Sequence, residues 1–293
     1  MTTLLTGGSG FVGRNILESS LAGKYAIVAP RHQELELLDE AAVRRYLLDH
    51  RVEYIIHAAA KPGHRNAADP GGVYYTNTRI FFNLARNQDL FKKMIVIGSG
   101  AIYDLRHYRP KMAEEYFGQH VPADEHGFSK YVMGLYGEGR KKIVDLRVFG
   151  IYGKYEDYAI RFISNLICKA LFDLPLTMKQ NRKFDYIHVD DLMPVLDFFL
   201  THETRFQAYN VTPDSAVELV ALAEKIKHLT GTAGEIRVAQ AGLGTEYSGD
   251  NRRLRAEMPG WRTTPLDEGI EKLHQWYREF RGTLNPELLK LDK

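Results

Sequence analysis

The sequence predicts an α/β fold, a doubly wound parallel sheet followed by a smaller C-terminal α/β region. Short apolar runs alternate with longer amphipathic segments over the first half of the chain, and a glycine-rich turn follows the first run. This alternation breaks after residue 149. Apolar strands that alternate with helices are typical of β-α-β units, whose right-handed crossovers place helices on both faces of a parallel sheet.

The predicted elements follow from this alternation. In the first half, we expect strands at 1–5, 25–29, 54–57, 94–97 and 143–147, and helices at 11–21, 40–50, 70–88 and 125–140. Beyond residue 149, we expect helices at 157–172, 190–201, 215–229 and 266–280, and extended segments at 184–189 and 208–211. Residues 1–148 and about 186–212 are assigned to the sheet domain, and residues 149–185 and 213–281 to a smaller substrate domain.

Composition excludes several classes of protein. The 293 residues suffice for a core domain with a smaller one, and 44% hydrophobic and 26% charged residues are ordinary for a globular chain. The net charge is only +2, and the basic residues are scattered among nearly as many acidic ones, which argues against a nucleic-acid partner. The N-terminus lacks a basic stretch followed by an apolar run, and no segment approaches the roughly 18–20 apolar residues of a membrane span. We therefore expect a cytoplasmic protein with no membrane partner.

Cysteine and metal-ligand patterns are uninformative about chemistry. The single cysteine, Cys168, cannot form an intramolecular disulfide, and its apolar helical setting predicts a buried structural thiol. No spacing of histidine and acidic residues suggests a metal site.

The glycine-rich turn is the strongest motif. It reads TGGSGFVG over residues 6–13 and lies between a predicted strand and a predicted helix. Gly7 permits the tight turn, Gly10 lets the backbone approach a pyrophosphate, and Gly13 lets helix and strand pack closely. The helix N-terminus then presents N–H groups to the anion, which predicts a Rossmann-type dinucleotide site formed by Gly7, Ser9, Gly10, Phe11, Val12 and Gly13.

The end of the second strand indicates which dinucleotide is bound. An acidic residue there would hold a ribose 2′-hydroxyl, whereas a basic residue accommodates a 2′-phosphate. The strand ends in APRH over residues 29–32, so Arg31 favours NADP(H). Asp39 is placed to bond the adenine amine or to cap the following helix, and the two roles can coexist.

Several further segments resemble the extended short-chain dehydrogenase/reductase family, also known as the NAD-dependent epimerase/dehydratase family. They are the HAAA segment at 57–60, Asn77, the segment FDYIHVDD at 184–191, YNV at 209–211, GWR at 260–262 and LDEG at 266–269. With the glycine turn, the resemblance covers about residues 1–280. It implies that Ala58, Ala59, Ala60, Asn77 and Lys130 contact the cofactor, that a nucleotide-linked sugar is the substrate, and that the protein is a homodimer.

Within this family, residues 31–39 and 110–115 resemble NADPH-dependent reductases of 4-keto sugar nucleotides, such as GDP-fucose synthase. In that branch, a cysteine two residues after the catalytic serine acts as an epimerisation base. Ala101 holds that position here, so epimerisation of that type is not expected. Gly150 also departs from the pattern, because many relatives have an asparagine there, near the substrate diphosphate.

The family catalyses with a Ser/Thr, a Tyr and a Lys. Ser99 at the end of the fourth strand matches the hydroxyl, and Lys130 matches the lysine, but His126 stands where the tyrosine is expected, four residues before Lys130. Three explanations stay open: His126 is the general acid, Tyr103 or a water donates the proton, or the protein binds its ligands without effective catalysis.

The substrate site is expected to include Ser99, Gly100, Tyr103, Arg182 and Arg252. Arg253 and the basic loop 61–65, which contains Lys61, His64 and Arg65, are further candidates for a phosphate contact. His188 and Asp190 are expected to hold the return segment together. The resulting hypothesis is an NADP(H)-dependent oxidoreductase that reduces a 4-keto-6-deoxy sugar nucleotide. The alternatives are a sugar-nucleotide 4-epimerase or dehydratase that retains its cofactor, and a catalytically silent binding protein.

Overall fold

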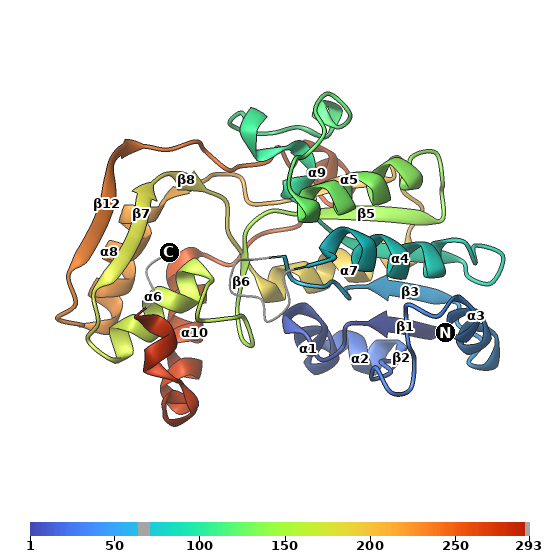
Figure 1. The fold of residues 1–293 in the computed structure, drawn as a ribbon, viewed down its shortest axis with the longest axis horizontal. Coiled ribbons are helices and arrows are strands. Elements are labelled where there is room, and N and C mark those ends of the chain that lie inside the picture. The colour runs from blue at the N-terminus through green and yellow to red at the C-terminus, as the bar shows by residue number, and fades with distance from the viewer. Residues whose placement is uncertain (64–70, 291–293) are drawn as a thin grey trace.

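A six-stranded parallel sheet forms the larger part of the protein. The computed structural model describes residues 1–63 and 71–290. The sheet has the order β10-β5-β4-β3-β1-β2, and all its neighbours pair in parallel. Its strands are β1 (Thr2–Thr6), β2 (Ala26–Val28), β3 (Tyr54–His57), β4 (Lys93–Ser99), β5 (Ile143–Val148) and β10 (Ala208–Val211). Figure 1 shows this sheet beside a smaller C-terminal region. The predicted doubly wound parallel sheet is therefore confirmed.

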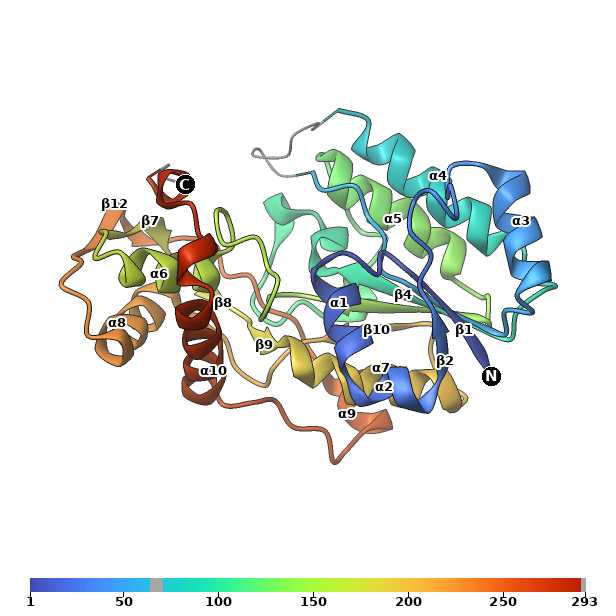
Figure 2. The same ribbon diagram turned by 90° about the horizontal axis from the view of Figure 1, so that it is seen from below.

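Helices cover both faces of the sheet, as Figure 2 shows. One face carries α1 (Phe11–Glu18), α2 (Ser20–Lys24) and α7 (Leu192–Thr201), and the other carries α3 (Glu40–Asp49), α4 (Val73–Ala85) and α5 (Glu125–Gly137). Neighbouring strand residues point to opposite faces, so Leu5 packs in the first core and Leu4 in the second. Because both faces are buried, the strands are continuous apolar runs and lack polar alternation.

The C-terminal region has a core of its own. It contains α6 (Phe162–Leu171), α8 (Leu219–Thr230), α10 (Leu266–Glu279) and the parallel pair of β7 (Leu176–Asn181) and β12 (Ile236–Leu243). Two shorter pairs, β6 (Ile151–Tyr152) with β9 (Ile187–His188) and β8 (Lys183–Phe184) with β11 (Val217–Glu218), lie between this core and the sheet. The helix α9 (Arg252–Glu257) packs beside β10. We propose the same domain boundaries that the sequence suggested.

The sequence-based elements differ from the structure in several places. The helix expected at 157–172 begins at Phe162, and the helix expected at 215–229 begins at Leu219 because residues 217–218 form β11. The helix expected at 11–21 is divided at Ser19, whose extended backbone ends α1 and whose side chain caps α2. The extended segment expected at 184–189 is two short strands, β8 and β9. Strands β7 and β12 were not predicted, because β7 is rich in polar residues and almost all of β12 is exposed, so neither shows the apolar period of a buried strand.

The strand order determines where a ligand can bind. The chain leaves β1 for β2 on one side and continues with β3 on the other side, so the order reverses next to β1. In open parallel sheets, ligands bind outside the carboxyl ends of the strands at such a reversal. The glycine turn after β1, the alanine segment after β3 and Ser99 at the end of β4 all lie at this edge.

Candidate functional site

The glycine turn packs too closely to accept side chains. A Cβ on Gly7, whose φ is +74°, would lie 2.7 Å from the backbone nitrogen of Ala59. A Cβ on Gly13 would lie 2.1 Å from the carbonyl oxygen of Gly7. No side chain caps the N-terminus of α1 at Gly10, and its first turn holds no acidic residue. The turn therefore leaves backbone N–H groups available for an anionic group, as a pyrophosphate requires.

A groove of about 580 Å³ runs from this turn along the loop after β2. Leu35, Leu37 and Leu38 give it an apolar wall, and Arg31 and Ser9 lie along it. The dimensions and lining fit the adenosine half of a dinucleotide, which needs apolar contact for the base and donors for the phosphates. Thr76 and Ile80 of α4 also line the groove, and no motif in the sequence singled them out.

The acidic side chains of the loop after β2, Glu34 and Glu36, contact other residues of the same loop. Glu34 accepts a hydrogen bond from the Arg31 backbone N–H at 2.7 Å. Glu36 lies 3.1 Å from the His32 ring and accepts a hydrogen bond from Leu38 N–H at 2.8 Å. Arg31 is exposed on the groove wall, so a positive charge is present where a ribose 2′-phosphate would lie.

Of the residues that the resemblance assigned to the cofactor, Ala59 lines the groove, whereas Ala58, Ala60 and Asp39 are not among its lining residues. Asp39 caps α3 by accepting a hydrogen bond from Ala42 N–H at 3.0 Å. The structure thus shows the helix cap, and a bond from Asp39 to the adenine amine, which can coexist with the cap, stays a prediction.

Asn77 acts on the chain after β3. Its side-chain oxygen accepts a hydrogen bond from Lys61 N–H at 2.7 Å, and its amide donates to the Lys61 carbonyl at 3.2 Å. Asn77 is buried and positions the loop after β3, and its expected contact with the cofactor stays a prediction. His64 and Arg65 of that loop lie outside the described residues.

Thr6 connects the ends of β1 and β3. Its hydroxyl lies 2.8 Å from Nδ1 of His57 and accepts a hydrogen bond from Ala59 N–H at 3.3 Å. His57 is buried, and its burial together with the charge of Lys130 lowers its pKa to about 3. A neutral His57 therefore fixes the two strand ends that carry the glycine turn and the alanine segment.

Ser99 lies half-buried at the end of β4, at the same edge. Its hydroxyl accepts a hydrogen bond from Ala101 N–H at 3.1 Å. Gly100 is buried, and a Cβ on it would lie 2.8 Å from the Phe149 ring, so the expected substrate contact of Gly100 is not supported.

His126 and Lys130 share one face of α5, behind this edge. Lys130 is buried and donates to the carbonyl oxygen of Ile97 at 3.0 Å. Burial and the charge of Lys130 lower the pKa of His126 to about 4, and the charge of Arg161 lowers it further. Nδ1 of His126 is buried without a hydrogen-bond partner among the described residues. At neutral pH His126 is thus an uncharged imidazole, which is a weak acid.

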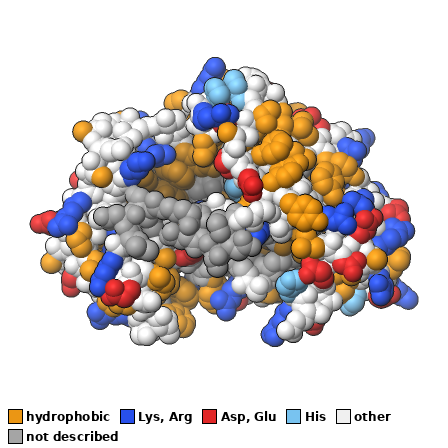
Figure 3. Space-filling view, viewed as in Figure 1, with side chains coloured by type: hydrophobic (Ala, Val, Ile, Leu, Met, Phe, Trp, Pro, Cys, Tyr) orange, Lys and Arg blue, Asp and Glu red, His pale blue; other side chains and the backbone are white. Residues whose placement is uncertain are grey.

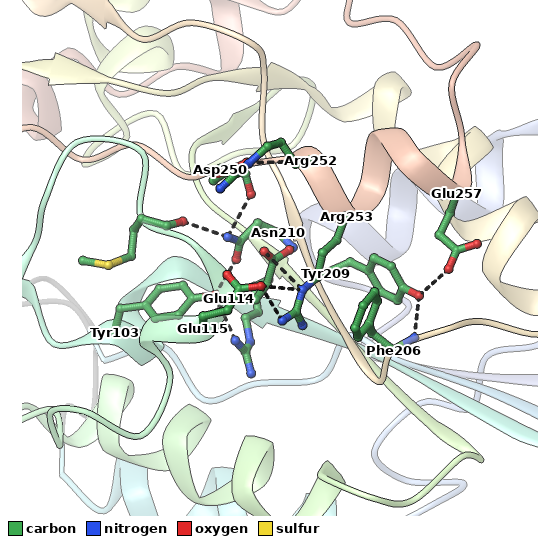
Figure 4. A network of polar contacts seen from close by, with 12 residues as sticks. Tyr103, Glu114, Glu115, Phe206, Tyr209, Asn210, Asp250, Arg252, Arg253 and Glu257 are labelled. Carbon is green, nitrogen blue, oxygen red and sulfur yellow. Dashed lines mark hydrogen bonds and ion pairs between the residues drawn. The ribbon is translucent and has the colours of Figure 1, made fainter.

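Tyr103 does not face this site. Its hydroxyl donates to Asn210 at 2.6 Å and accepts from the Arg147 guanidinium at 2.9 Å, and the ring is buried. Figure 4 shows it in a polar network with Glu114 and Arg253. The expectation that Tyr103 contacts substrate or donates the proton is therefore wrong, because both functions of its hydroxyl are occupied inside the protein.

This network surrounds a second hollow, of about 290 Å³, between the C-terminal half of α5 and β10. Arg253 pairs with Glu115 at 2.7 Å and lies 3.8 Å from Glu114 (Figure 4). Burial raises the pKa of Glu114, although the backbone of Asn210 and the nearby arginines oppose that shift. These partners argue against the phosphate contact considered for Arg253.

Two further arginines, Arg252 and Arg182, were expected to contact the substrate. Arg252 is an exposed residue whose guanidinium pairs with Asp250 at 2.6 Å, so its expected diphosphate contact is not supported. Arg182 is half-buried before β8, and its charge acts on Tyr186. Arg161, which no motif identified, precedes α6, and its charge acts on His126, Tyr186 and Tyr247.

The segment 184–191 connects the sheet to the C-terminal region. His188 caps the turn that follows it and lies 3.3 Å from Asp190, as expected for residues that hold this segment together. A Cβ on Gly150 would lie 1.9 Å from the Asp185 carbonyl oxygen, which explains why an asparagine cannot occupy that position without a shift of the backbone.

Within residues 1–63 and 71–290, no group of three or more histidine, cysteine or acidic side chains could hold a metal ion. No helix in those ranges is both long and apolar enough to cross a membrane.

Comparison with known proteins agrees with this fold. Residues 3–212 match the NAD dependent epimerase/dehydratase family. The chain is 23% identical to a probable GDP-L-fucose synthase of Oryza sativa over 94% of this chain and 91% of that protein. A match of 35% identity to GDP-L-colitose synthase of Yersinia pseudotuberculosis covers 35% of each chain.

Solved structures show the same fold. A GDP-L-fucose synthetase of Naegleria fowleri, bound to NADP, has a TM-score of 0.83 at 16% identity, covering 96% of this chain and 94% of that one. A GDP-mannoheptose C4 reductase of Campylobacter jejuni, also with NADP, has a TM-score of 0.81 at 21% identity, covering 94% and 98%. The chain belongs to the NAD-dependent epimerase/dehydratase family and is therefore a member of a family of nicotinamide-dependent enzymes that modify nucleotide-linked sugars.

The tight backbone packing within the glycine turn leads to a first prediction. Gly13→Ala places a methyl group 2.1 Å from the Gly7 carbonyl, so the turn must shift, and we expect at least tenfold weaker NADPH binding by fluorescence titration. Gly23→Ala is the matched control, because nothing lies within 4 Å of its Cβ position in α2. Equal NADPH affinities for the two variants would contradict this account of the turn.

The buried His126 leads to a prediction about pH and stability. Its folded pKa of about 4 lies below the ordinary histidine pKa of about 6.5, so the unfolded chain binds the proton first as pH falls. His126 therefore contributes stability above pH 6.5 that is lost between pH 6.5 and 4.

We expect His126→Gln to flatten the fall in free energy of unfolding between pH 6.5 and 4, measured by urea denaturation at each pH. The exposed His228, substituted in the same way, serves as control and is expected to keep the wild-type pH dependence. Identical pH profiles for His126→Gln and wild type would exclude a depressed pKa.

Proposed function

We propose that this protein is an NADP(H)-dependent reductase of a nucleotide-linked sugar, with 4-keto-6-deoxy sugar nucleotides as its substrate class. The observation that carries the proposal is the groove that joins the glycine turn to Arg31, at the same edge of the sheet as Ser99. A bound reduced nicotinamide supplies a hydride to a carbonyl carbon. The residues of the turn fit its pyrophosphate, and Arg31 fits a 2′-phosphate.

The residues of the chain have separate functions in this reaction. The Ser99 hydroxyl is placed to donate a hydrogen bond to the carbonyl oxygen, which gains negative charge during reduction. Lys130, whose pKa is lowered by burial, is fixed by the Ile97 carbonyl and holds the nicotinamide ribose in the family's manner. Arg161 and Arg182 are the cations that we assign to the substrate diphosphate.

A homodimer and a cytoplasmic location stay predictions. The surface that a dimer would use lies on α4 and α5, where hydrophobic side chains gather in Figure 3. Tyr75 is 65% exposed on α4 and Leu135 is 45% exposed on α5, and Tyr74 stacks on Phe128 between the two helices at 4.8 Å.

The test of the proposal follows NADPH oxidation by the pure protein with 4-keto-6-deoxy sugars linked to GDP, dTDP, CDP or UDP, with NADH in parallel. Stoichiometric oxidation with one of them is the expected result, and it identifies the nucleotide. Conversion of a sugar nucleotide without net NADPH consumption would instead indicate an epimerase or dehydratase. Tight NADPH binding without any conversion would indicate a binding protein.

Arg31 is expected to determine the preference for NADPH. Arg31→Ser removes the charge beside the 2′-phosphate, so we expect the KM for NADPH to rise about tenfold or more and the KM for NADH to change little, because a hydrogen bond to a charged group contributes about 1.5–3 kcal/mol. Arg45→Ser, an exposed change on α3, is the control. A similar rise in KM for both cofactors would show that Arg31 does not contact the 2′-phosphate.

A further inference from the structure

The proposed reduction needs a proton donor, and the described residues around Ser99 offer one that the sequence motifs do not mark. The family tyrosine is replaced by His126, which is uncharged at neutral pH. The hydroxyl of Tyr103 is engaged by Asn210 and Arg147. Two other hydroxyls lie beside Gly100. That of Tyr108 donates its hydrogen to the Gly100 carbonyl oxygen, and that of Tyr247, in the segment between β12 and α9, lies on the side where a Cβ of residue 100 would be.

Tyr247 reaches across to the end of β4. A Cβ built on Gly100 would lie 2.6 Å from the Tyr247 hydroxyl oxygen, so only a glycine after Ser99 leaves room for this hydroxyl. The hydroxyls of Ser99 and Tyr108 lie within hydrogen-bonding reach of the Tyr247 hydroxyl. A serine and a tyrosine hydroxyl thus meet at one point, which is the arrangement that carbonyl reduction with proton transfer needs.

The backbone around Tyr247 is held firmly in place. Tyr247 N–H donates to the Lys183 carbonyl at 2.9 Å, and the Tyr247 carbonyl accepts from Asp185 N–H at 3.0 Å. Two residues later, Gly249 N–H donates to the Asp185 carboxylate at 2.8 Å. Ser248 is fixed from the other side, because its carbonyl accepts a hydrogen bond from Met112 N–H at 2.9 Å. The segment is therefore pinned between β8 and the chain before α5.

The ring of Tyr247 is equally constrained. It stacks on Phe184 at a centroid distance of 4.5 Å and on Tyr108 at 4.9 Å, and it lies 5.2 Å from Phe149. Burial raises the pKa of Tyr247 to about 12, while the hydroxyls of Tyr108 and Ser99 oppose that shift by stabilising its anion. Tyr247 is thus protonated at neutral pH, and as a half-buried side chain it can exchange a proton with water.

The geometry points to Tyr247 as the general acid of the reduction, supplied by the C-terminal region in place of the missing tyrosine of α5. In this step the carbonyl carbon gains a hydride from the reduced nicotinamide, and the carbonyl oxygen takes the proton of the Tyr247 O–H bond. The products are the alcohol, the oxidised cofactor and a tyrosinate, which recovers a proton from water. This inference rests on the proposed reductase function and names its proton donor.

The test uses Tyr247→Phe, which removes the hydroxyl and keeps the ring stacked. General acid catalysis contributes about 10²–10⁴-fold, so we expect kcat to fall at least 100-fold with the 4-keto-6-deoxy sugar nucleotide that the wild type reduces. The KM for that substrate and the NADPH dissociation constant, measured by fluorescence, are expected to stay within about threefold of wild type. Tyr116→Phe, the same change at a residue whose hydroxyl contacts Arg109, is the matched control.

A double variant tests whether a tyrosine on α5 can take over the function of Tyr247. His126→Tyr in the Tyr247→Phe background restores a tyrosine four residues before Lys130, and we expect it to recover kcat at least tenfold. A merely structural Tyr247 would show the opposite pattern, with a changed melting temperature or NADPH affinity and no rescue by a tyrosine on α5.

The outcomes separate the two proposals. A wild-type reductase whose Tyr247→Phe variant keeps more than about a third of kcat overturns the assignment of Tyr247 and leaves the proposed function intact. A wild type that reduces none of the four nucleotide-linked sugars overturns the proposed function, and the assignment of Tyr247 with it.

Discussion

The arrangement of the site depends on the close contact between the glycine turn after β1 and the alanine segment after β3. Gly7 lies so near the backbone of Ala59 that no side chain fits between them. The Thr6 hydroxyl also forms a hydrogen bond with Nδ1 of His57 and accepts one from Ala59 N–H, and these contacts join the two strand ends. Because both strands are parallel and end at one edge, this contact forms the floor on which a dinucleotide can lie.

The second feature of the site is a largely buried region behind Ser99. His57, His126 and Lys130 all have lowered pKa values, because burial disfavours their charged forms and the lysine charge acts on both histidines. A histidine beside Lys130 on α5 is therefore a poor general acid, because its protonated form is disfavoured. A tyrosine from the C-terminal region avoids this conflict, because it is neutral at neutral pH and its hydroxyl lies among hydroxyl groups.

The C-terminal region also fixes the segment that carries Tyr247. Asp185 is fully buried, accepts hydrogen bonds from Thr212 and from Gly249, and has its pKa raised to about 6 by burial. This carboxyl group links the return segment of the sheet to the segment that carries Tyr247. Gly150 packs against the Asp185 carbonyl from the other side. The departure from the family pattern at Gly150 therefore reflects packing at the junction of the two parts.

The sequence by itself determined the parallel sheet, because buried strands must be short apolar runs, and it determined the glycine turn, because its backbone geometry excludes side chains. The family resemblance also indicated Ser99 and Lys130 and the tyrosine that His126 replaces, because each is matched by its position in one local motif. The sequence could not identify the approach of the Tyr247 hydroxyl to Gly100, the polar partners of Tyr103 or the pairing of Arg252 with Asp250. Strands β7 and β12 were missed because polar, exposed strands lack an apolar period. These features come from segments far apart in the chain, so only the tertiary structure, which brings those segments into contact, decided them.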